Sequence, residues 1–265
     1  MNEVAVPNPD FEAQKTDYFV QLGVHVQDAL KLHKARGLWE RDAEGKRDWG
    51  NVSEHCLVEA ARAREFGQLL GFEEGLIEDL ITAAALHDFY KKDEKAIVTK
   101  QGLSWEAFEE ASHESSEAIR EAGFSDRIAW LVGAVGHGSL LDTKEILEET
   151  EPTPDQEAFL VMHYIDDYTV GSDWAEPASG VSNFDIRMDK NEANERYRLL
   201  NEEGRPFFNG RTTFEIQRQL GHEIEARLVD MINVRSGQHV SPADLPVFID
   251  DQIRTRIASP TQQAA

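Results

Sequence analysis

Six residues of this chain are suited by type to metal chemistry: His55, His87, Asp88, His113, His137 and Asp166. Neutral imidazoles and ionised carboxylates are the groups that borderline divalent metals bind. The contiguous His87-Asp88 pair adds a carboxylate that could bridge two ions. We therefore expect a metal centre, and the donors are numerous enough for two metals.

Helical spacing predicts that the first of these residues point inward. His55 shares one side of a predicted helix with Val58. Residues 76–85 form an apolar face that ends at His87 and Asp88, so this pair closes a buried helix. A carboxylate buried in that position needs a cation nearby.

The last candidates lie further along the chain. His137 stands between Gly136 and Gly138, two residues that let the backbone approach a site closely. Asp166 and Asp167 are adjacent, so in a helix they occupy neighbouring faces. We expect Asp166 to be the ligand and keep Asp167 as the alternative.

In this order, the segments NVSEH (51–55), LHDFYK (86–91) and YIDD (164–167) resemble motifs of the HD-domain superfamily of metal-dependent phosphohydrolases. They correspond to that family's first histidine, its His-Asp pair and its terminal aspartate. The resemblance covers about residues 50 to 170. It implies an all-α fold, a bundle of helices around the metal site, here with extra helices at both ends.

The resemblance also implies a ligand set. The first metal would be held by His55, His87, Asp88 and Asp166, and the second, as in the binuclear branch, by Asp88, His113 and His137. The Gly-Tyr-Pro signature and paired histidines of the cyclic-dinucleotide class are missing around His137, which argues against that substrate. Alternatively, His113 and His137 are helix caps or substrate contacts and the centre holds one metal.

The expected reaction is hydrolysis of a small phosphate ester or nucleotide by a metal-bound hydroxide. Asp88 would bridge the ions, and Lys91 or His137 would hold the phosphate or protonate the leaving oxygen. Lys91 resembles the lysine of the family's HDxxK variant. Lys91, Lys92 and Arg187 are the expected substrate-binding cations. The expected cofactor is two divalent ions: iron, manganese or zinc, with magnesium and nickel as further candidates.

Glu54 and Cys56, which flank His55, and five further histidines are not expected to be metal ligands. Glu54 is a candidate to orient an imidazole or, alternatively, a solvated residue of the first turn. Cys56, the single cysteine, is expected to fill the core. No role is assigned to the remaining histidines: His25, His33, His163, His222 and His239.

Composition favours a soluble cytoplasmic enzyme with a small phosphorylated substrate. The net charge of −23, from 27 basic and 50 acidic residues, repels nucleic acid. No apolar run approaches the roughly 18–20 residues of a membrane helix, and the N-terminal residues do not resemble a signal peptide. The single cysteine fits a reducing compartment. The sequence does not indicate an oligomeric state.

Apolar residues recur with helical period through most of the chain. We expect helices at about 16–36, 189–203 and 212–235, and polar connections over 37–51, 91–102 and 139–154. The stretch 171–192 lacks a clear period, and we expect a surface loop or, alternatively, a substrate lid carrying Arg187 and Lys190.

These elements predict one elaborated domain over residues 1–258. Its core would be about 50–170, followed by a helical extension over 171–258 and a disordered tail over 259–265.

Two other functions fit the same residues. The HD superfamily includes di-iron oxygenases that cleave carbon–carbon or carbon–phosphorus bonds of small polar substrates, and ligand identity alone does not separate them from hydrolases. A protein that binds a nucleotide or a partner without turnover is a third reading, but pure binding does not need so many ligands.

Overall fold

The computed structural model describes residues 9–38, 50–102, 104–172 and 183–258. Within these ranges the chain forms thirteen α-helices and no strand, so the predicted all-α class is confirmed. The tail 259–265 and most of the predicted connection over 37–51 lie outside the described residues.

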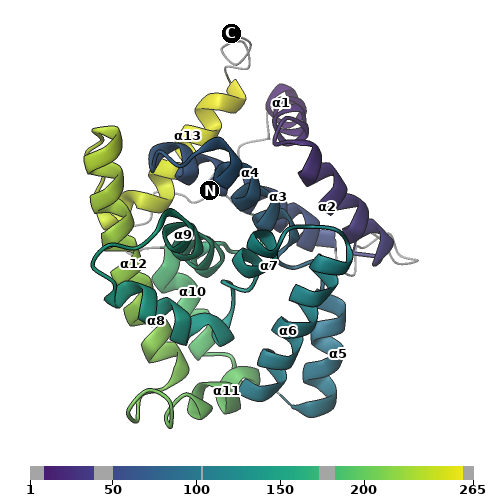
Figure 1. Cartoon of the computed structure of the whole chain (residues 1–265), viewed down its shortest axis with the longest axis vertical. Helices are drawn as coiled ribbons and strands as arrows, with labels where there is room; N and C mark the ends of the chain where they lie inside the picture. Colours follow the sequence, from purple (N-terminus) through teal and green to yellow (C-terminus); the bar gives the residue numbers. More distant parts are fainter. Residues whose placement is uncertain (1–8, 39–49, 103, 173–182, 259–265) are drawn as a thin grey trace, which may run out of the picture.

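Helix α9 (Pro154–Tyr168) lies at the centre of the molecule and carries both candidate aspartates. In Figure 1 it is seen almost end-on, with other helices on every side. A capping box between Thr153 and Gln156 and a proline in the first turn fix its start. Its residues are almost all buried, and it packs against α3, α4, α7, α8, α10 and α12. Side chains on different faces of α9 therefore reach different parts of the core.

Helices α3 (Gly50–Leu69) and α4 (Glu74–Leu86) form a closely packed pair. The turn between them uses Gly71 in the left-handed region, at φ 68°. The helices approach so closely that a Cβ on Gly67 would lie 2.9 Å from Ile77 Cγ1. This pair brings residues of mid-α3 next to the C-terminal end of α4.

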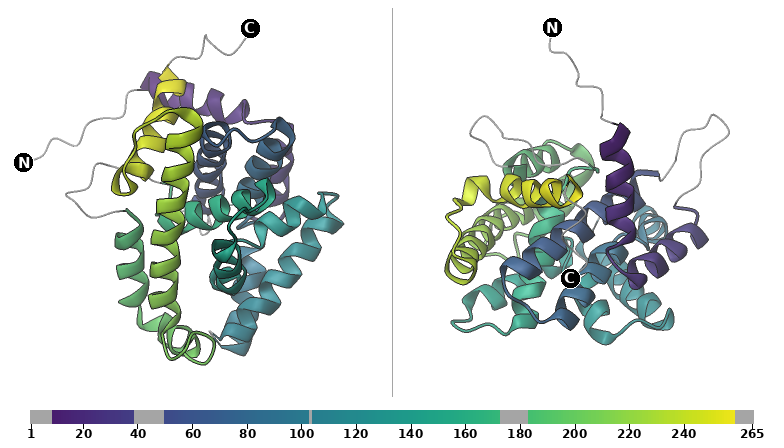
Figure 2. Two further views of the ribbon diagram at one scale, coloured as in Figure 1. Left: turned by 60° about the vertical axis from the view of Figure 1, so that its left-hand side comes forward. Right: turned by 90° about the horizontal axis from the view of Figure 1, so that it is seen from above.

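A second helix pair follows, where the sequence predicted a loop over 91–102. Residues Lys91–Gln101 form α5, which packs against α6 (Trp105–Glu121) across a turn at Gly102. Figures 1 and 2 show the two helices side by side. The predicted connection 139–154 likewise contains α8 (Leu140–Glu148), which follows α7 (Asp126–Val132) and a short 3-10 turn.

The opening helix predicted over 16–36 is two helices in the structure. They are α1 (Pro9–Val20) and α2 (Val24–Ala35). Gly23 separates them with φ 127°, a backbone conformation that a continuous helix cannot contain. Helix α1 packs against α13, and α2 packs against α3 and α4.

The C-terminal part packs onto this core. It comprises α10 (Asn183–Glu192), α11 (Arg198–Glu203), α12 (Thr213–Ser236) and α13 (Leu245–Ala258). The predicted helix 212–235 corresponds to α12, the long helix in Figure 2, whereas 189–203 spans the end of α10 and all of α11. Residues 173–182 of the predicted loop or lid are outside the described part, and 183–192 are helical. Helices α10 and α12 contact α9, and α13 contacts α3.

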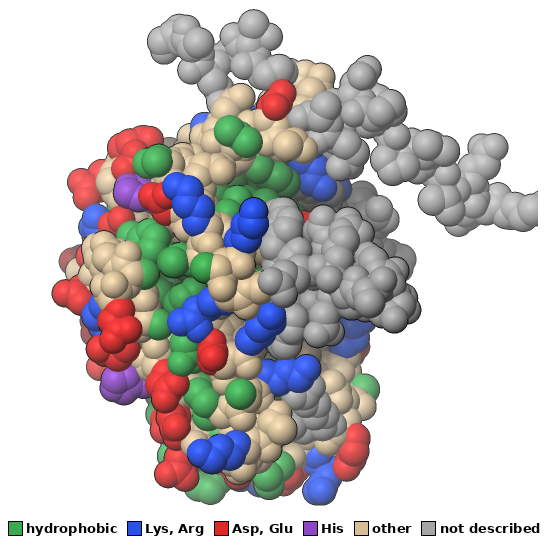
Figure 3. Space-filling view, turned by 90° about the vertical axis from the view of Figure 1, so that its right-hand side faces the viewer, with side chains coloured by type: hydrophobic (Ala, Val, Ile, Leu, Met, Phe, Trp, Pro, Cys, Tyr) green, Lys and Arg blue, Asp and Glu red, His purple; other side chains and the backbone are tan. Residues whose placement is uncertain are grey.

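The surface charge is unevenly distributed. On the face shown in Figure 3, Lys and Arg side chains gather across the middle and acidic side chains follow the left edge. The charged side chains that give the net charge of −23 are therefore not spread evenly over this face. None of the helices in the described ranges is long and apolar enough to cross a bilayer.

Candidate metal centre

The imidazoles of His55 on α3 and His87 just after α4 are held in the same way. His55 Nδ1 lies 2.7 Å from the carbonyl oxygen of Gly171, and His87 Nδ1 lies 2.8 Å from that of Ala84. A carbonyl oxygen only accepts hydrogen bonds, so Nδ1 carries the hydrogen in both rings. In the neutral form of each ring, the lone pair is therefore on Nε2.

Both Nε2 atoms face one carboxylate oxygen. His55 Nε2 is 3.7 Å and His87 Nε2 is 3.9 Å from Asp166 Oδ1. His87 Nε2 also lies 3.8 Å from Asp88 Oδ2, and it is buried without a hydrogen bond among the described residues. Atoms that bind one metal ion are about 3–4 Å from each other, given bond lengths near 2.1 Å. Lone pairs of three expected ligands, His55, His87 and Asp166, are thus arranged as around a single cation. The fourth expected ligand, Asp88, lies near His87 but outside this group.

Glu59, which the sequence reasoning missed, completes this arrangement. It lies one turn after His55 on α3 and is fully buried. Its carboxylate oxygens are 3.1 Å from His55 Nε2 and 3.3 Å from His87 Nδ1, without forming a hydrogen bond. Because His55 Nε2 and the carboxylate both present lone pairs, they repel unless a proton or a metal ion lies between them.

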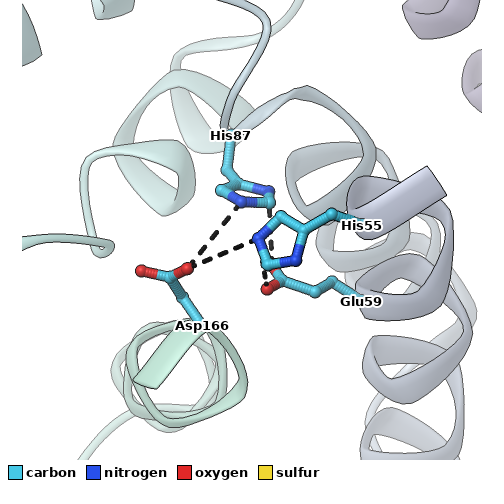
Figure 4. Close-up of side chains that lie close together, drawn as sticks. All are labelled: His55, Glu59, His87 and Asp166. Atoms are coloured by element: carbon cyan, nitrogen blue, oxygen red, sulfur yellow. Dashed lines mark ion pairs between the residues drawn. The ribbon is translucent and has the colours of Figure 1, made fainter. Parts of the chain in front are cut away.

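His55, Glu59, His87 and Asp166 could hold a metal ion, because one ligand atom from each lies within 4.8 Å of the others. Figure 4 shows these side chains converging from separate segments, with His55 and Glu59 on the same helix. The His-x-x-x-Glu spacing on a predicted buried face is the signal that could have identified Glu59 from the sequence.

Two acidic groups at the centre, Asp88 and Asp166, have lowered pKa values and are ionised near pH 7. Burial alone would raise the pKa of Asp88, but Lys91 and the imidazoles lower it to about 2. The pKa of Asp166 is also lowered, because the neighbouring imidazoles of His55 and His87 outweigh the effect of burial. Burial would lower the pKa of His55, but Glu59 and Asp166 raise it. A metal ion would therefore compete with protons for these imidazoles.

The candidate metal centre opens into a cavity of about 510 Å³, which His55, His87 and Asp166 line. Lys91 lines it, with Nζ 3.1 Å from Asp88 Oδ1 and 3.3 Å from Glu94 Oε2. Arg187 on α10 lines it as well and donates to the carbonyl oxygen of Thr169 at 3.2 Å. Lys95 is a third cation on the wall, which the sequence reasoning missed because it placed this segment in a loop.

Two expected site residues are not brought to the cavity. His113 is exposed on α6, whereas Ser112 and Ser115 of the same helix line the cavity. Successive helical residues are about 100° apart, so the cavity-facing side of α6 excludes His113. The expected second-metal set of Asp88, His113 and His137 is therefore not assembled.

Lys92 also lies away from the cavity. Its Nζ donates to the carbonyl oxygen of Gly37, just after the end of α2, at 2.8 Å. The expectation that Lys92 binds substrate is thus not supported, because the side chain of its neighbour Lys91 takes the cavity side. Lys190 is exposed and does not line the cavity.

His137 lines the cavity, but it is outside the group of metal-binding atoms. Its ring contacts the aromatic rings of Phe108, Tyr197 and Phe214. Burial lowers the pKa of His137 to about 4, so the ring is neutral near pH 7. Its Nδ1 is buried and has no hydrogen-bond partner within the described ranges. A neutral imidazole can make hydrogen bonds to a ligand but carries no spare proton for a leaving group.

Of the two adjacent aspartates, Asp166 faces the imidazoles of His55 and His87. Asp167 has other partners. Asp167 Oδ1 accepts a hydrogen bond from Gln217 on α12.

Glu54 is half-buried and does not line the cavity. Cys56 is fully buried, which raises the pKa of its thiol and agrees with a role in the core.

No known protein family, curated protein or solved structure matches the chain.

Proposed function

We propose that this chain is a metal-dependent phosphohydrolase of the HD-domain type, acting on a small phosphate ester. The observation that carries the proposal is the orientation of His55 and His87. Both rings use Nδ1 for a backbone carbonyl and direct Nε2 toward Asp166 Oδ1. The order of these residues along the chain is that of the HD superfamily, which they resemble.

The chemistry of the donor set fits a divalent cation. Two imidazole nitrogens with ionised Asp166 and Asp88, and with Glu59 beside them, suit zinc, manganese or iron. A divalent ion bound there would lower the pKa of water and neutralise charge on phosphoryl oxygens. In this proposal His55, His87 and Asp166 hold the ion, with either Asp88 or Glu59 as the fourth donor.

The cations of the cavity wall fit an anionic substrate. Burial would lower the pKa of Lys91, but Asp88 and Glu94 raise it well above its ordinary value. Lys91 thus stays protonated, and it holds a phosphate oxygen rather than donating a proton. Arg187, which lines the same cavity, is placed to hold a second oxygen. The two cations would orient the ester beside the metal ligands.

The positions of the possible metal ligands favour hydrolysis over the oxygenase alternative. A di-iron reaction needs donors for two ions, and His113, an expected ligand of the second ion, is exposed on α6. Within the described part of the chain, His55, Glu59, His87 and Asp166 form the one group of three or more possible metal ligands. One metal ion and an anion-binding wall are sufficient for phosphate-ester hydrolysis.

The test combines metal loading with an assay of a panel of phosphate mono- and diesters, with and without dioxygen. We expect hydrolysis, seen as release of the alcohol from either kind of ester, that depends on added metal and not on dioxygen. His87→Ala should abolish metal binding and turnover, whereas the matched control His113→Ala should retain both. Absence of alcohol release from every ester with zinc, manganese and iron would overturn the proposal, as would turnover that consumes dioxygen.

A further inference from the structure

Asp167, next to the expected metal ligand Asp166, faces a different part of the same cavity. It is 4% exposed and lines the cavity wall. Its Oδ1 accepts a hydrogen bond from Gln217 Nε2 at 2.5 Å. Its Oδ2 lies 3.3 Å from His163 Nε2, an ion-pair separation, but has no hydrogen-bond partner among the described residues.

Gln217 is oriented by this contact. Because a carboxylate only accepts, the amide nitrogen must face Asp167. The amide oxygen Oε1 is then directed elsewhere, and it has no hydrogen-bond partner within the described ranges although Gln217 is only 2% exposed. Gln217 also lines the cavity. Asp167 and Gln217 thus each present one unpartnered acceptor on the same wall.

His137 and Ser115 add to this polar wall. Both line the cavity, and His137 Nδ1 and Ser115 Oγ are buried without partners in the described part of the chain. A buried polar atom without a hydrogen bond costs roughly 1–3 kcal/mol, so such atoms are normally satisfied by water or a ligand. Four such atoms, from four separate elements, belong to residues that line one cavity, which is therefore suited to a ligand with polar groups.

The surroundings of Asp167 favour a hydrogen-bond donor as that group. His163 is fixed with its Nδ1 2.8 Å from the carbonyl oxygen of Ala134, so this ring nitrogen carries a hydrogen. The imidazole on one side and the Gln217 amide on the other hold the carboxylate in place. Asp167 Oδ2, which faces His163 Nε2 at 3.3 Å, and Gln217 Oε1 are the two acceptors without a hydrogen bond among the described residues. An anionic group would be repelled here, whereas an amine or a hydroxyl would be bound.

We propose that Asp167 and Gln217, with His137 beside them, form a second binding subsite that holds an amine or hydroxyl group of the substrate. The subsite rests on the proposed function for the other end of the substrate, where Lys91 and Arg187 hold the phosphate. A cavity of about 510 Å³ accommodates a small molecule that reaches both places. The substrate is then a phosphate ester whose organic part ends in a hydrogen-bond donor.

The experiment uses three matched series of phosphate esters: ω-aminoalkyl, ω-hydroxyalkyl and n-alkyl phosphates over a short range of chain lengths. Their Kd values are measured by calorimetry on the full chain without added metal, and kcat/KM is measured separately with metal. At the best chain length we expect the amino or hydroxy ester to bind at least about 10-fold more tightly than the alkyl ester, the gain typical of one additional hydrogen bond. A preference for amine over hydroxyl would identify an ammonium group as the natural donor.

Two variants assign the preference to the subsite. Asp167→Asn removes the charge and Gln217→Met removes the acceptor, and each should reduce the preference to about one. Gln217→Met keeps the test decisive if Asp167→Asn does not fold. The control Glu157→Gln changes another buried carboxylate of α9, which pairs with Arg235 and does not line the cavity, and should leave the preference unchanged.

The outcomes separate the two proposals. Equal binding of the three series at every length, or a preference that persists in both variants, would overturn the subsite. Hydrolysis of all three series at equal rates would leave the phosphohydrolase standing without the subsite. A donor preference that both variants remove, with no ester hydrolysed, would establish the subsite and refute the phosphohydrolase.

Discussion

Glu59 lies against both imidazoles of the metal centre without a hydrogen bond of its own. Burial raises the pKa of its carboxyl group, and the charges of His87 and His55 act against that increase. A buried carboxylate in this position strengthens the binding of a cation, either as a ligand or by holding the rings that bind it.

Glu59→Gln should therefore weaken metal binding by about 10–100-fold, the range measured for groups that support metal ligands. The side chain keeps its size, so helix content should be retained. Glu54→Gln, on the same helix and outside the cavity, is the control and should bind metal as the unmodified chain does. Competition with a fluorescent metal chelator measures both affinities. Equal affinities for the two variants would show that Glu59 does not contribute to metal binding.

Lys91 and Lys92 offer a matched pair of variants, because only Lys91 lines the cavity. Lys91→Met should raise KM for phosphate esters by about 10-fold or more, the loss expected for one charge-assisted hydrogen bond. Lys92→Met should leave KM unchanged, since the Nζ of Lys92 donates to Gly37. Steady-state kinetics with the best ester of the panel provides the measurement. An equal rise in both variants would indicate a general effect of surface charge.

The candidate site could be predicted from the sequence only where residue type and helical face were both informative. His55, His87 and Asp166 were found because metal-binding side chains lie on apolar helical faces, and the structure brings them together. The exposed position of His113 was not predicted, because the neighbouring residues in the sequence do not indicate which side of α6 faces the cavity. Glu59 was missed because glutamate in a helix is ordinarily solvated, and its burial depends on tertiary packing.

At the scale of helices, His33 joins three elements. From α2, its Nε2 lies 2.9 Å from the carbonyl oxygen of Ala85 on α4, and its Nδ1 lies 3.1 Å from Ser53 Oγ on α3. Burial lowers the pKa of His33 from 6.5 to about 4. The folded chain therefore binds the His33 proton less readily than the unfolded chain, and stability falls as the pH decreases from 6.5 toward 4.

His33→Gln removes this titration. Between about pH 7 and about pH 5 the unmodified chain should lose about 2 kcal/mol more unfolding free energy than the variant does. Urea denaturation at the two pH values measures the difference. Parallel losses in the two proteins would mean that His33 is protonated equally in the folded and unfolded states.

Periodicity predicted the all-α class because most helices bury one apolar face, but it did not predict every boundary. The apolar period continues across Leu22 and Gly23, so the break between α1 and α2 depends on the backbone of one glycine. Helix α5 has a single buried residue, Val98, so it lacks the apolar face that usually stabilises a helix. Its packing against α6 stabilises it instead. That pairing cannot be read from a local window of sequence.

At the scale of the whole molecule, a buried ion pair joins the C-terminal helix, α13, to α3. Arg62 of α3 donates two hydrogen bonds to Asp250 of α13, at 2.9 and 2.7 Å, and one to Thr169 Oγ1, at 2.6 Å. Its guanidinium also lies 4.6 Å from the centre of the Tyr168 ring. The predicted C-terminal extension is thus bound to the helix that carries His55.

Asp250→Ala should destabilise the whole molecule by about 3–5 kcal/mol, because it leaves a buried Arg62 without its carboxylate partner. The double variant Arg62→Met with Asp250→Leu should recover much of that loss, since it leaves no buried charge. Chemical denaturation of the three proteins gives the unfolding free energies. A loss below about 1 kcal/mol for Asp250→Ala would show that this ion pair contributes little to the stability of the molecule.

The convergence of His55, His87 and Asp166 on one cation is tested most directly by a crystal structure of the protein with zinc, using anomalous scattering at the zinc edge. We predict one anomalous peak about 2.0–2.2 Å from the Nε2 atoms of both histidines and from a carboxylate oxygen of Asp166. A zinc peak away from these three residues, or coordination through Nδ1 in place of Nε2, would contradict the account.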